Sequence, residues 1–198
     1  WMPVVHPLPS RRIMTLRASN ARLIRRALLA LREPPFHRAR FSSTTLLADT
    51  ETTPMANAFL EKLHPGFSQT IELEGAPIVQ EKSRFQDIKI FDSKRNGRVL
   101  VLDDIVQLTT RDECGYSEML THVPMFEHGR VKEVMIVGGG DMAIAEEALK
   151  HRAVTNVFNV EIDEKVVDLS RRHLGEVNAA AFADPRLKVQ IEDAFVFL

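Results

Sequence analysis

The sequence predicts an α/β fold in which a small antiparallel β-domain precedes a parallel sheet flanked by helices. Between residues 70 and 108, short β-like runs alternate with turn residues at intervals of about ten residues, which is typical of hairpins. After Gly129, apolar strands alternate with helical segments, and this rhythm specifies a parallel sheet with right-handed crossovers. The chain has 198 residues, of which 44% are hydrophobic, so it can bury one sizeable core.

A basic leader precedes these elements. Residues 1–54 contain nine Arg, no Lys and three acidic residues, which leaves 17 basic and 24 acidic residues in 55–198. The apolar residues of the leader recur at roughly helical spacing among the arginines, and Ser and Thr residues follow. This composition is typical of a mitochondrial transit peptide and also of an RNA-binding arm. The simplest interpretation is upstream sequence without a role in the fold, because Met55 opens a segment that could be a natural start.

We therefore expect residues 1–54 to be disordered and the protein to be cytoplasmic, or mitochondrial if residues 1–48 act as a transit peptide. We expect no nucleic-acid partner. No apolar run approaches the roughly 20 residues that span a bilayer, so no membrane association is expected. The single cysteine, Cys114, cannot form an internal disulfide and has no His at ligand spacing, so no metal site is predicted. His122 and His151 have no acid at a diagnostic spacing and are assigned to packing or to the surface.

The β-domain is predicted over residues 55–109. Its turns are expected where Gly and Asp residues interrupt the apolar pattern, at Glu74-Gly75, Asn96-Gly97 and Asp103-Asp104. The expected strands are 70–73, 76–81, 87–91, 98–101 and 105–108.

A linking helix is predicted within residues 110–130. Thr110 and Glu113 have the spacing of a capping box, with Thr at the cap and Glu three residues later. The helix is expected to run towards Val123 and to stop before Pro124, because the residue before a proline disfavours helical geometry.

Residues 131–198 are predicted to form an incomplete Rossmann-like domain. Three strands and two intervening helices are expected, and the third strand would remain an open edge that favours aggregation or pairing with a second chain. The strands are 134–137, 157–160 and 187–191, and the helices are 142–151 and 165–173.

A glycine loop follows the first of these strands. Gly138, Gly140 and Ala143 match the G-x-G-x-x-G/A pattern, with Gly139 inside it. Glu161 follows about 20 residues later, at the end of the next strand. This context predicts a nucleoside-binding half-site in which the two carboxylate oxygens of Glu161 accept hydrogen bonds from ribose hydroxyls.

The loop carries an acid where a dinucleotide site needs free backbone amides. Asp141 places a carboxylate at the helix N-terminus, which disfavours a pyrophosphate. At an effective dielectric constant of about 20, two unit charges about 4 Å apart interact by about 4 kcal/mol, a penalty for phosphate and an attraction for a cation. Asp193 ends the third strand, so Asp141, Glu161 and Asp193 are expected to meet in one crevice. Three carboxylates close together in this crevice predict that the ligand is a cationic nucleoside.

An ordered series of motifs resembles the polyamine aminopropyltransferases of the spermidine synthase type. The motifs are Arg84–Ile88, Val101–Asp103, Gln107, Arg111–Glu113, Tyr116, Glu118–Pro124, Gly138–Asp141 and Glu161–Asp163. The resemblance implies a small β-domain followed by a Rossmann-like, S-adenosylmethionine-methyltransferase-like domain, usually assembled as a homodimer. It also implies transfer of the aminopropyl group of decarboxylated S-adenosylmethionine to putrescine, with no cofactor besides this co-substrate.

The same resemblance implies roles for single residues of the nucleoside site. Gln86 and Asp141 match contacts to the aminopropyl-bearing nucleoside, and Glu161 matches a ribose ligand. Asp193 and Ala194 match the pair beside the adenine.

On the amine side, Tyr116 matches a residue that lines the amine pocket, and Ser117 stands where a His or Gln usually helps to hold the amine. The catalytic base of the family is an Asp at the end of the fourth strand, which we expect beyond Leu198. Met142 and Ala194 each replace a glycine of the family pattern, and a long side chain at 142 is expected to crowd the ligand.

Two alternatives stay open. One is an inactive, truncated paralogue that binds nucleosides or pairs with a full-length subunit. The other is an S-adenosylmethionine-dependent methyltransferase, which would use the same first half of the sheet. This alternative does not explain the presence of the β-domain or of Gln86 and Tyr116.

Overall fold

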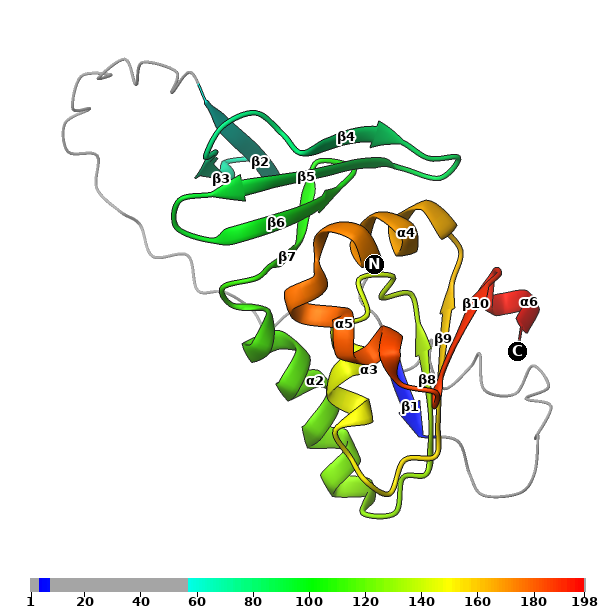
Figure 1. The fold of residues 1–198 in the computed structure, drawn as a ribbon. Helices are drawn as coiled ribbons and strands as arrows, with labels where there is room; N and C mark the ends of the chain where they lie inside the picture. The colour runs from blue at the N-terminus through cyan, green and yellow to red at the C-terminus, as the bar shows by residue number, and fades with distance from the viewer. Residues whose placement is uncertain (1–3, 8–56, 198) are drawn as a thin grey trace. The chain divides into compact units, whose positions relative to one another are not determined.

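Three sheets organise the residues that the computed structural model describes, 4–7 and 57–197 (Figure 1). All of them belong to one unit, which comprises residues 1–10 and 55–198. The predicted order, an antiparallel β-domain followed by a parallel sheet, is confirmed.

The β-domain contains a hairpin and a four-stranded antiparallel sheet. The hairpin pairs β2 (Ala58–His64) with β3 (Phe67–Glu72). The larger sheet follows chain order through β4 (Val79–Lys82), β5 (Asp87–Ser93), β6 (Gly97–Leu102) and β7 (Ile105–Thr109).

Strand β2 escapes the sequence prediction because it mixes charged and apolar residues. Glu61 of this strand is nevertheless buried. Its carboxylate accepts hydrogen bonds from the side chain of Gln69 and from the Val106 N–H, the latter at 2.8 Å. This acid ties the hairpin to β7, and a buried carboxylate with such partners cannot be recognised from an alternation of polar and apolar residues.

The turn between β6 and β7 forms without glycine. Asp103 and Asp104 have φ angles of 49° and 63°, as a two-residue hairpin turn of type I′ requires at both central positions. The Asp103 carboxylate also accepts the Asp87 N–H at 2.9 Å. Aspartate tolerates the left-handed region better than most residues, so the turn keeps its predicted position.

Helix α2 (Glu113–His128) corrects the prediction for the linking helix at both ends. Its N-cap residue is Asp112, with no side-chain cap hydrogen bond, and the Thr110 hydroxyl instead accepts the Arg98 N–H at 3.0 Å. The helix continues past Pro124 and ends at Gly129, whose φ of 71° is the left-handed cap geometry.

Packing explains why Pro124 does not end α2. Ser117, Thr121 and Met125 lie on one helix face, are buried, and follow the i, i+4, i+8 spacing. This face packs against α3 (Ala143–Leu149), so tertiary contact outweighs the one backbone hydrogen bond that proline removes.

The second sheet contains three parallel strands in the order β8 (Glu133–Val137), β9 (Asn156–Glu161) and β10 (Leu187–Ile191). As predicted, β10 is an edge strand of the described sheet. The remaining helices are α4 (Glu164–His173), α5 (Gly175–Ala183) and α6 (Ala194–Phe197). Helix α5 was not predicted from the sequence, because its run of alanines shows no distinct apolar stripe.

The other edge of this sheet is occupied by β1 (Val4–Pro7), which pairs antiparallel with β8. The expectation of disorder is therefore wrong for these four residues, whose backbone supplies partners to an otherwise open strand edge. The other expectations for residues 1–54 fall outside the described part of the chain.

One hydrophobic cluster joins the four-stranded antiparallel sheet to helix α4 beside the parallel sheet. Ile88, Ile90 and Leu100 of the sheet share it with Val166 and Leu169 of α4. This shared core holds the loop before β5 close to the start of α4, which matters for the site described below.

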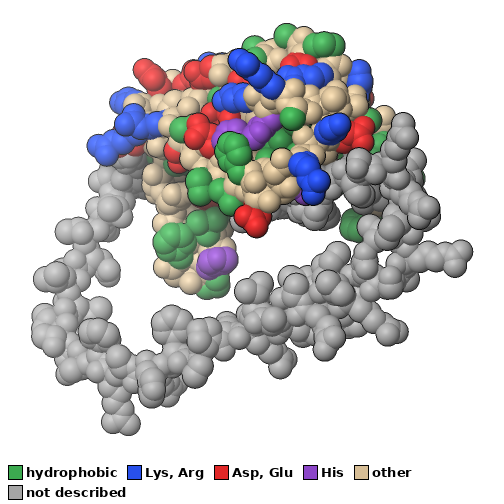
Figure 2. Space-filling model, turned by 90° about the horizontal axis from the view of Figure 1, so that it is seen from below, with side chains coloured by type: hydrophobic (Ala, Val, Ile, Leu, Met, Phe, Trp, Pro, Cys, Tyr) green, Lys and Arg blue, Asp and Glu red, His purple; other side chains and the backbone are tan. Residues whose placement is uncertain are grey.

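The outer face of α2 is apolar and exposed. Tyr116, Met119, Val123 and Phe126 recur at helical spacing and keep 45%, 64%, 54% and 72% of their surface exposed. Figure 2 shows hydrophobic side chains gathered in patches among charged ones on the face that it presents. Among the described helices, none combines the length and apolarity that crossing a bilayer would need.

Candidate functional site

The glycine loop turns the chain from β8 into α3. Gly138 and Gly139 have φ angles of 77° and 73°, a conformation that side chains with a Cβ atom rarely adopt. The Gly138 N–H donates to the Val160 carbonyl at 2.9 Å, so the loop begins as a continuation of the β8–β9 ladder.

The carboxylate of Glu161 lies directly under this loop. Its Oε2 accepts the Gly140 N–H at 3.1 Å, and its Oε1 accepts the Asp163 N–H at 3.0 Å. Only 8% of the residue is exposed. Burial raises the pKa of Glu161, while the backbone hydrogen bonds oppose this effect. Each oxygen retains one further acceptor position for a ligand hydroxyl.

Asp141 stands at the end of the loop, and its Oδ1 accepts the Ala143 N–H at 2.8 Å. The residue keeps some exposed surface, but burial of its carboxyl group raises the pKa of Asp141. Burial also raises the pKa of Tyr116, and the charge of Asp141 adds to this increase. Tyr116 of α2 and Asp141 are therefore electrostatic neighbours.

Gln86 reaches the same site from the β-domain through Asp163. The Gln86 side-chain amide donates to Asp163 Oδ2 at 2.8 Å, and the Ser83 hydroxyl donates to the same oxygen at 2.6 Å. Because the Asp163 N–H in turn donates to Glu161, one continuous hydrogen-bonded chain links Gln86, Asp163, Glu161 and Gly140.

Sequence reasoning missed the role of Asp163. Its Oδ1 accepts the Lys165 N–H at 3.1 Å and caps α4, while its Oδ2 holds Gln86 and Ser83. The available signal was an aspartate two residues before the predicted helix 165–173, since aspartate is favoured at N-caps.

The other predicted residues lie in different environments. Asp193 is exposed and its Oδ1 accepts the Phe195 N–H at 2.9 Å, at the start of the short helix that Ala194 opens. Ile191 pairs with Glu161 in the β9–β10 register, so Asp193 lies two residues beyond Glu161 at the same sheet edge. Ser117 is buried and donates to Glu113 at 2.9 Å within α2.

The structure thus links Gln86 to Glu161 through Asp163. It lets the charge of Asp141 act on Tyr116, and it sets Asp193 at the same sheet edge as Glu161. Among the described residues, no hydrogen bond joins Asp141, Glu161 and Asp193 to one another.

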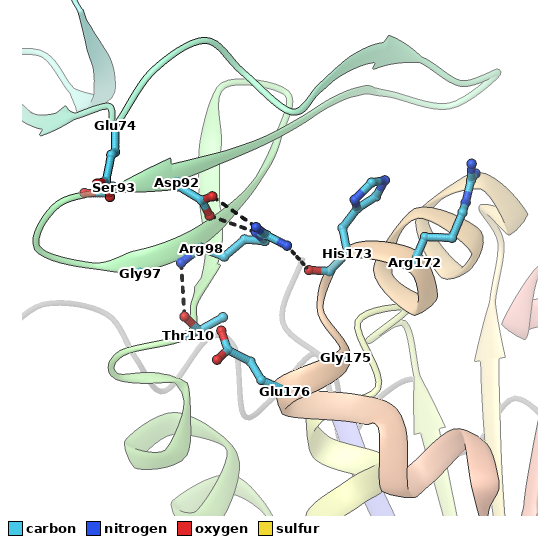
Figure 3. A pocket seen from close by; sticks show the side chains of 10 residues that line it. All are labelled: Glu74, Asp92, Ser93, Gly97, Arg98, Thr110, Arg172, His173, Gly175 and Glu176. Atoms are coloured by element: carbon cyan, nitrogen blue, oxygen red, sulfur yellow. Dashed lines mark hydrogen bonds and ion pairs between the residues drawn. The ribbon is translucent and has the colours of Figure 1, made fainter.

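A separate polar hollow of about 520 Å³ lies between the β5–β6 turn and the α4–α5 junction (Figure 3). Arg98 spans it, pairing with Asp92 and donating to the His173 carbonyl at 2.8 Å. None of the predicted nucleoside-site residues lines this hollow, and Arg98 serves there to connect the antiparallel sheet with α4.

Two histidines outside the site connect α2 with the end of α3. His122 Nδ1 lies 2.9 Å from His151 Nε2, and His122 Nε2 lies 3.1 Å from Glu147 Oε2. Glu147 also pairs with Lys150. The acid partner of His122 is on another helix, which is why sequence spacing did not reveal it.

Acid is expected to weaken this contact between α2 and α3. Burial and the neighbouring His122 lower the pKa of His151, although Glu147 opposes them. His151 therefore binds a proton more readily in the unfolded chain than in the folded chain. Its contribution to stability is complete above its pKa in the unfolded chain, and it is lost as pH falls through its lower pKa in the folded chain. Urea unfolding between about pH 7.5 and pH 5 should show this loss in the wild type and a smaller one in His151→Asn. Parallel profiles for the two proteins would contradict it.

No group of three or more His, Cys, Asp or Glu side chains is arranged to hold a metal ion within residues 57–197. Cys114 is exposed and unpaired with another cysteine of that range.

Two family models match the chain in succession. The spermidine synthase tetramerisation domain matches residues 59–110, and the spermine/spermidine synthase domain matches residues 113–198.

Individual relatives agree with these models. A polyamine aminopropyltransferase of Serratia proteamaculans is 44% identical over 138 residues, covering 70% of this chain and 48% of the relative. A polyamine aminopropyltransferase of Yersinia pestis is 43% identical, covering 70% of this chain and 46% of the relative. The chain thus spans about half the length of the curated relatives that it matches.

Solved structures show the same fold. The crystal structure of spermidine synthase from Thermotoga maritima superposes with a TM-score of 0.69 at 33% identity, covering 72% of this chain and 50% of that one. A spermidine synthase in complex with a transition-state analogue superposes with a TM-score of 0.67 at 34% identity, covering 70% of this chain and 47% of that one.

Proposed function

The chain belongs to the spermine/spermidine synthase family, and from this premise we propose that residues 57–197 form the nucleoside-binding side of an aminopropyltransferase site. The co-substrate is decarboxylated S-adenosylmethionine, and the acceptor is putrescine. The observation that carries the proposal is the hydrogen-bonded chain from Gln86 through Asp163 to Glu161 and Gly140, with Asp141 beside it.

Each group has a defined task in this proposal. Glu161 accepts hydrogen bonds from the ribose hydroxyls, held in place by the two backbone N–H groups that it already binds. Asp141 faces the positive charge of the sulfonium or the aminopropyl ammonium group. Asp193 and Ala194 lie beside the adenine, and Tyr116 lines the path of the amine.

The reaction needs a neutral amine nitrogen to attack the carbon attached to the sulfonium sulfur. A C–N bond forms, the C–S bond breaks with its electrons on sulfur, and a neutral thioether, methylthioadenosine, leaves. The proton lost by the amine passes to a base, which the family places at the end of a fourth parallel strand. No such strand is present among the described residues, so the decisive experiment measures binding rather than turnover.

Electrostatics predict the order of affinities. Burial raises the pKa of both Asp141 and Glu161, so a bound cation favours their ionised forms and its affinity should rise as pH increases through those raised values. S-adenosylmethionine carries an additional carboxylate and NAD a pyrophosphate, and both add negative charge near these acids.

Calorimetry should therefore show decarboxylated S-adenosylmethionine binding most tightly, followed by S-adenosylmethionine and then NAD. Asp141→Asn should reduce the preference for decarboxylated S-adenosylmethionine over neutral methylthioadenosine by about tenfold, the equivalent of about 1.4 kcal/mol. The matched control is Asp168→Asn, on the exposed side of α4. If S-adenosylmethionine bound more tightly than decarboxylated S-adenosylmethionine, the result would favour a methyltransferase. The absence of any nucleoside binding would overturn the proposal.

We also propose that copies of the chain associate. The match to a model named for tetramerisation covers residues 59–110, and β10 is an edge strand of the described sheet. Sedimentation velocity distinguishes the homodimer implied by the family resemblance from a tetramer.

A further inference from the structure

A buried amide lies beneath the glycine loop. Asn159, in the middle of β9, is 0% exposed. Its Nδ2 group donates to the carbonyls of both Gly138 and Gly139, each at 3.1 Å. Both N–H bonds of this side chain are therefore directed at two consecutive carbonyls of the loop.

The loop needs such a partner because of its backbone conformation. Gly138 and Gly139 both have positive φ angles. The Gly139 carbonyl also accepts the Met142 N–H at 3.0 Å, whereas the Gly138 carbonyl has the Asn159 amide as its donor. The Asn159 amide therefore supplies the Gly138 carbonyl with its donor and the Gly139 carbonyl with a second one, which stabilises this loop conformation against alternatives.

The Asn159 side chain donates to the loop through its nitrogen, while its own oxygen is left without a partner. Its Oδ1 is buried and has no hydrogen-bond partner among the described residues. Its neighbour Val160 is buried, and an apolar side chain at 159 would avoid burying an unpaired oxygen. Core packing alone therefore gives no reason for an asparagine here, whereas the loop does.

A second buried amide holds the far end of the same loop. Asn178 of α5 is 0% exposed and donates to the Asp141 carbonyl and the Ser170 carbonyl, both at 3.0 Å. Between these two amides lie the Gly140 N–H, which binds Glu161, and the carboxylate of Asp141. The position of the loop therefore sets the spacing between the two acids.

We propose that Asn159 is a positioning residue for nucleoside binding, which holds the glycine loop at the distance from Glu161 that the ligand requires. This inference rests on the proposed function for the identity of the ligand. It concerns a residue that touches the loop rather than the ligand, and Asn178 holds the other end of the same loop.

The test is Asn159→Leu in the full chain, because leucine removes the amide and leaves an apolar group of similar size. Affinity for decarboxylated S-adenosylmethionine should fall by about tenfold or more, since two hydrogen bonds to the loop are lost. The urea midpoint of unfolding should change little, because the loss of the donor to the Gly138 carbonyl is offset by removal of the buried, unpartnered Oδ1. The control is Asn156→Leu, at the amino end of the same strand and away from the loop, which should bind as the wild type does.

Amide hydrogen exchange gives a second readout that needs no ligand. In Asn159→Leu, the Gly140 amide should exchange faster while that of Val157 in the same strand remains protected. Unchanged affinity and unchanged Gly140 exchange would overturn the positioning role and leave the proposed function standing. A lower unfolding midpoint with equally faster exchange at Gly140 and Val157 would assign Asn159 to general stability and also overturn it. If the wild type bound no nucleoside, the proposed function would fail, and the exchange result would still decide the role of Asn159 in the loop.

Discussion

Gly140→Ala is expected to weaken nucleoside binding by at least about tenfold and to lower the free energy of unfolding by about 1–3 kcal/mol. A Cβ atom at this position would lie 2.9 Å from Val166 Cγ1, 3.1 Å from Glu161 Cγ and 3.2 Å from Glu161 Oε2. Both neighbours are buried, so neither can swing into solvent. Displacing Glu161 would also lengthen its hydrogen bond with the Gly140 N–H, which the proposed site depends on.

The measurement is calorimetry together with urea unfolding, and Gly115 offers a matched control. Gly115 lies within α2, and nothing stands within 4 Å of the Cβ that alanine would add. Gly115→Ala should therefore raise stability by about 0.5–1 kcal/mol, since alanine is the better helix former, and leave binding unchanged. Wild-type affinity in Gly140→Ala would show that the Glu161 carboxylate is not held by this loop.

The fold could be predicted where local pattern and tertiary packing agree. Strand β8 and its loop combine an apolar run with three glycines, and the structure keeps both. The end of α2 could not be predicted, because the local signal of Pro124 is opposed by a buried helix face and by a cap at Gly129 that together favour a longer helix. Local signals of this kind give a preference that packing can reverse.

The candidate site was predictable only in part, for a related reason. Glu161 and Asp141 follow from spacing along the chain, because strand ends of a parallel sheet meet at one edge. Asn159 and Asp163 act through tertiary contacts that spacing along the chain does not reveal. Asn159 pairs with Ile136, two residues before Gly138, and this places its amide under the loop. In the sequence it is one polar residue in an apolar strand.

The final prediction concerns Met142, which has a φ of 67° and is 0% exposed. The resemblance to the family led us to expect its side chain to crowd the ligand, whereas it lies in the core cluster that also contains Met125 and Ile144. Met142→Gly would relieve the left-handed strain of an L-residue, about 1–2 kcal/mol, but would remove a fully buried side chain, for which truncation costs about 2–5 kcal/mol. Burial outweighs strain, so the free energy of unfolding should fall by about 1–3 kcal/mol.

Met142→Leu separates the two effects, because it keeps the volume in the core and the strain in the backbone. It should cost less than about 1.5 kcal/mol in the same urea titration. A more stable Met142→Gly protein would mean that backbone strain dominates at this position. The expected order, wild type above Met142→Leu above Met142→Gly, would instead mean that this chain tolerates a strained residue after Asp141 because its side chain completes the contact between α2 and α3.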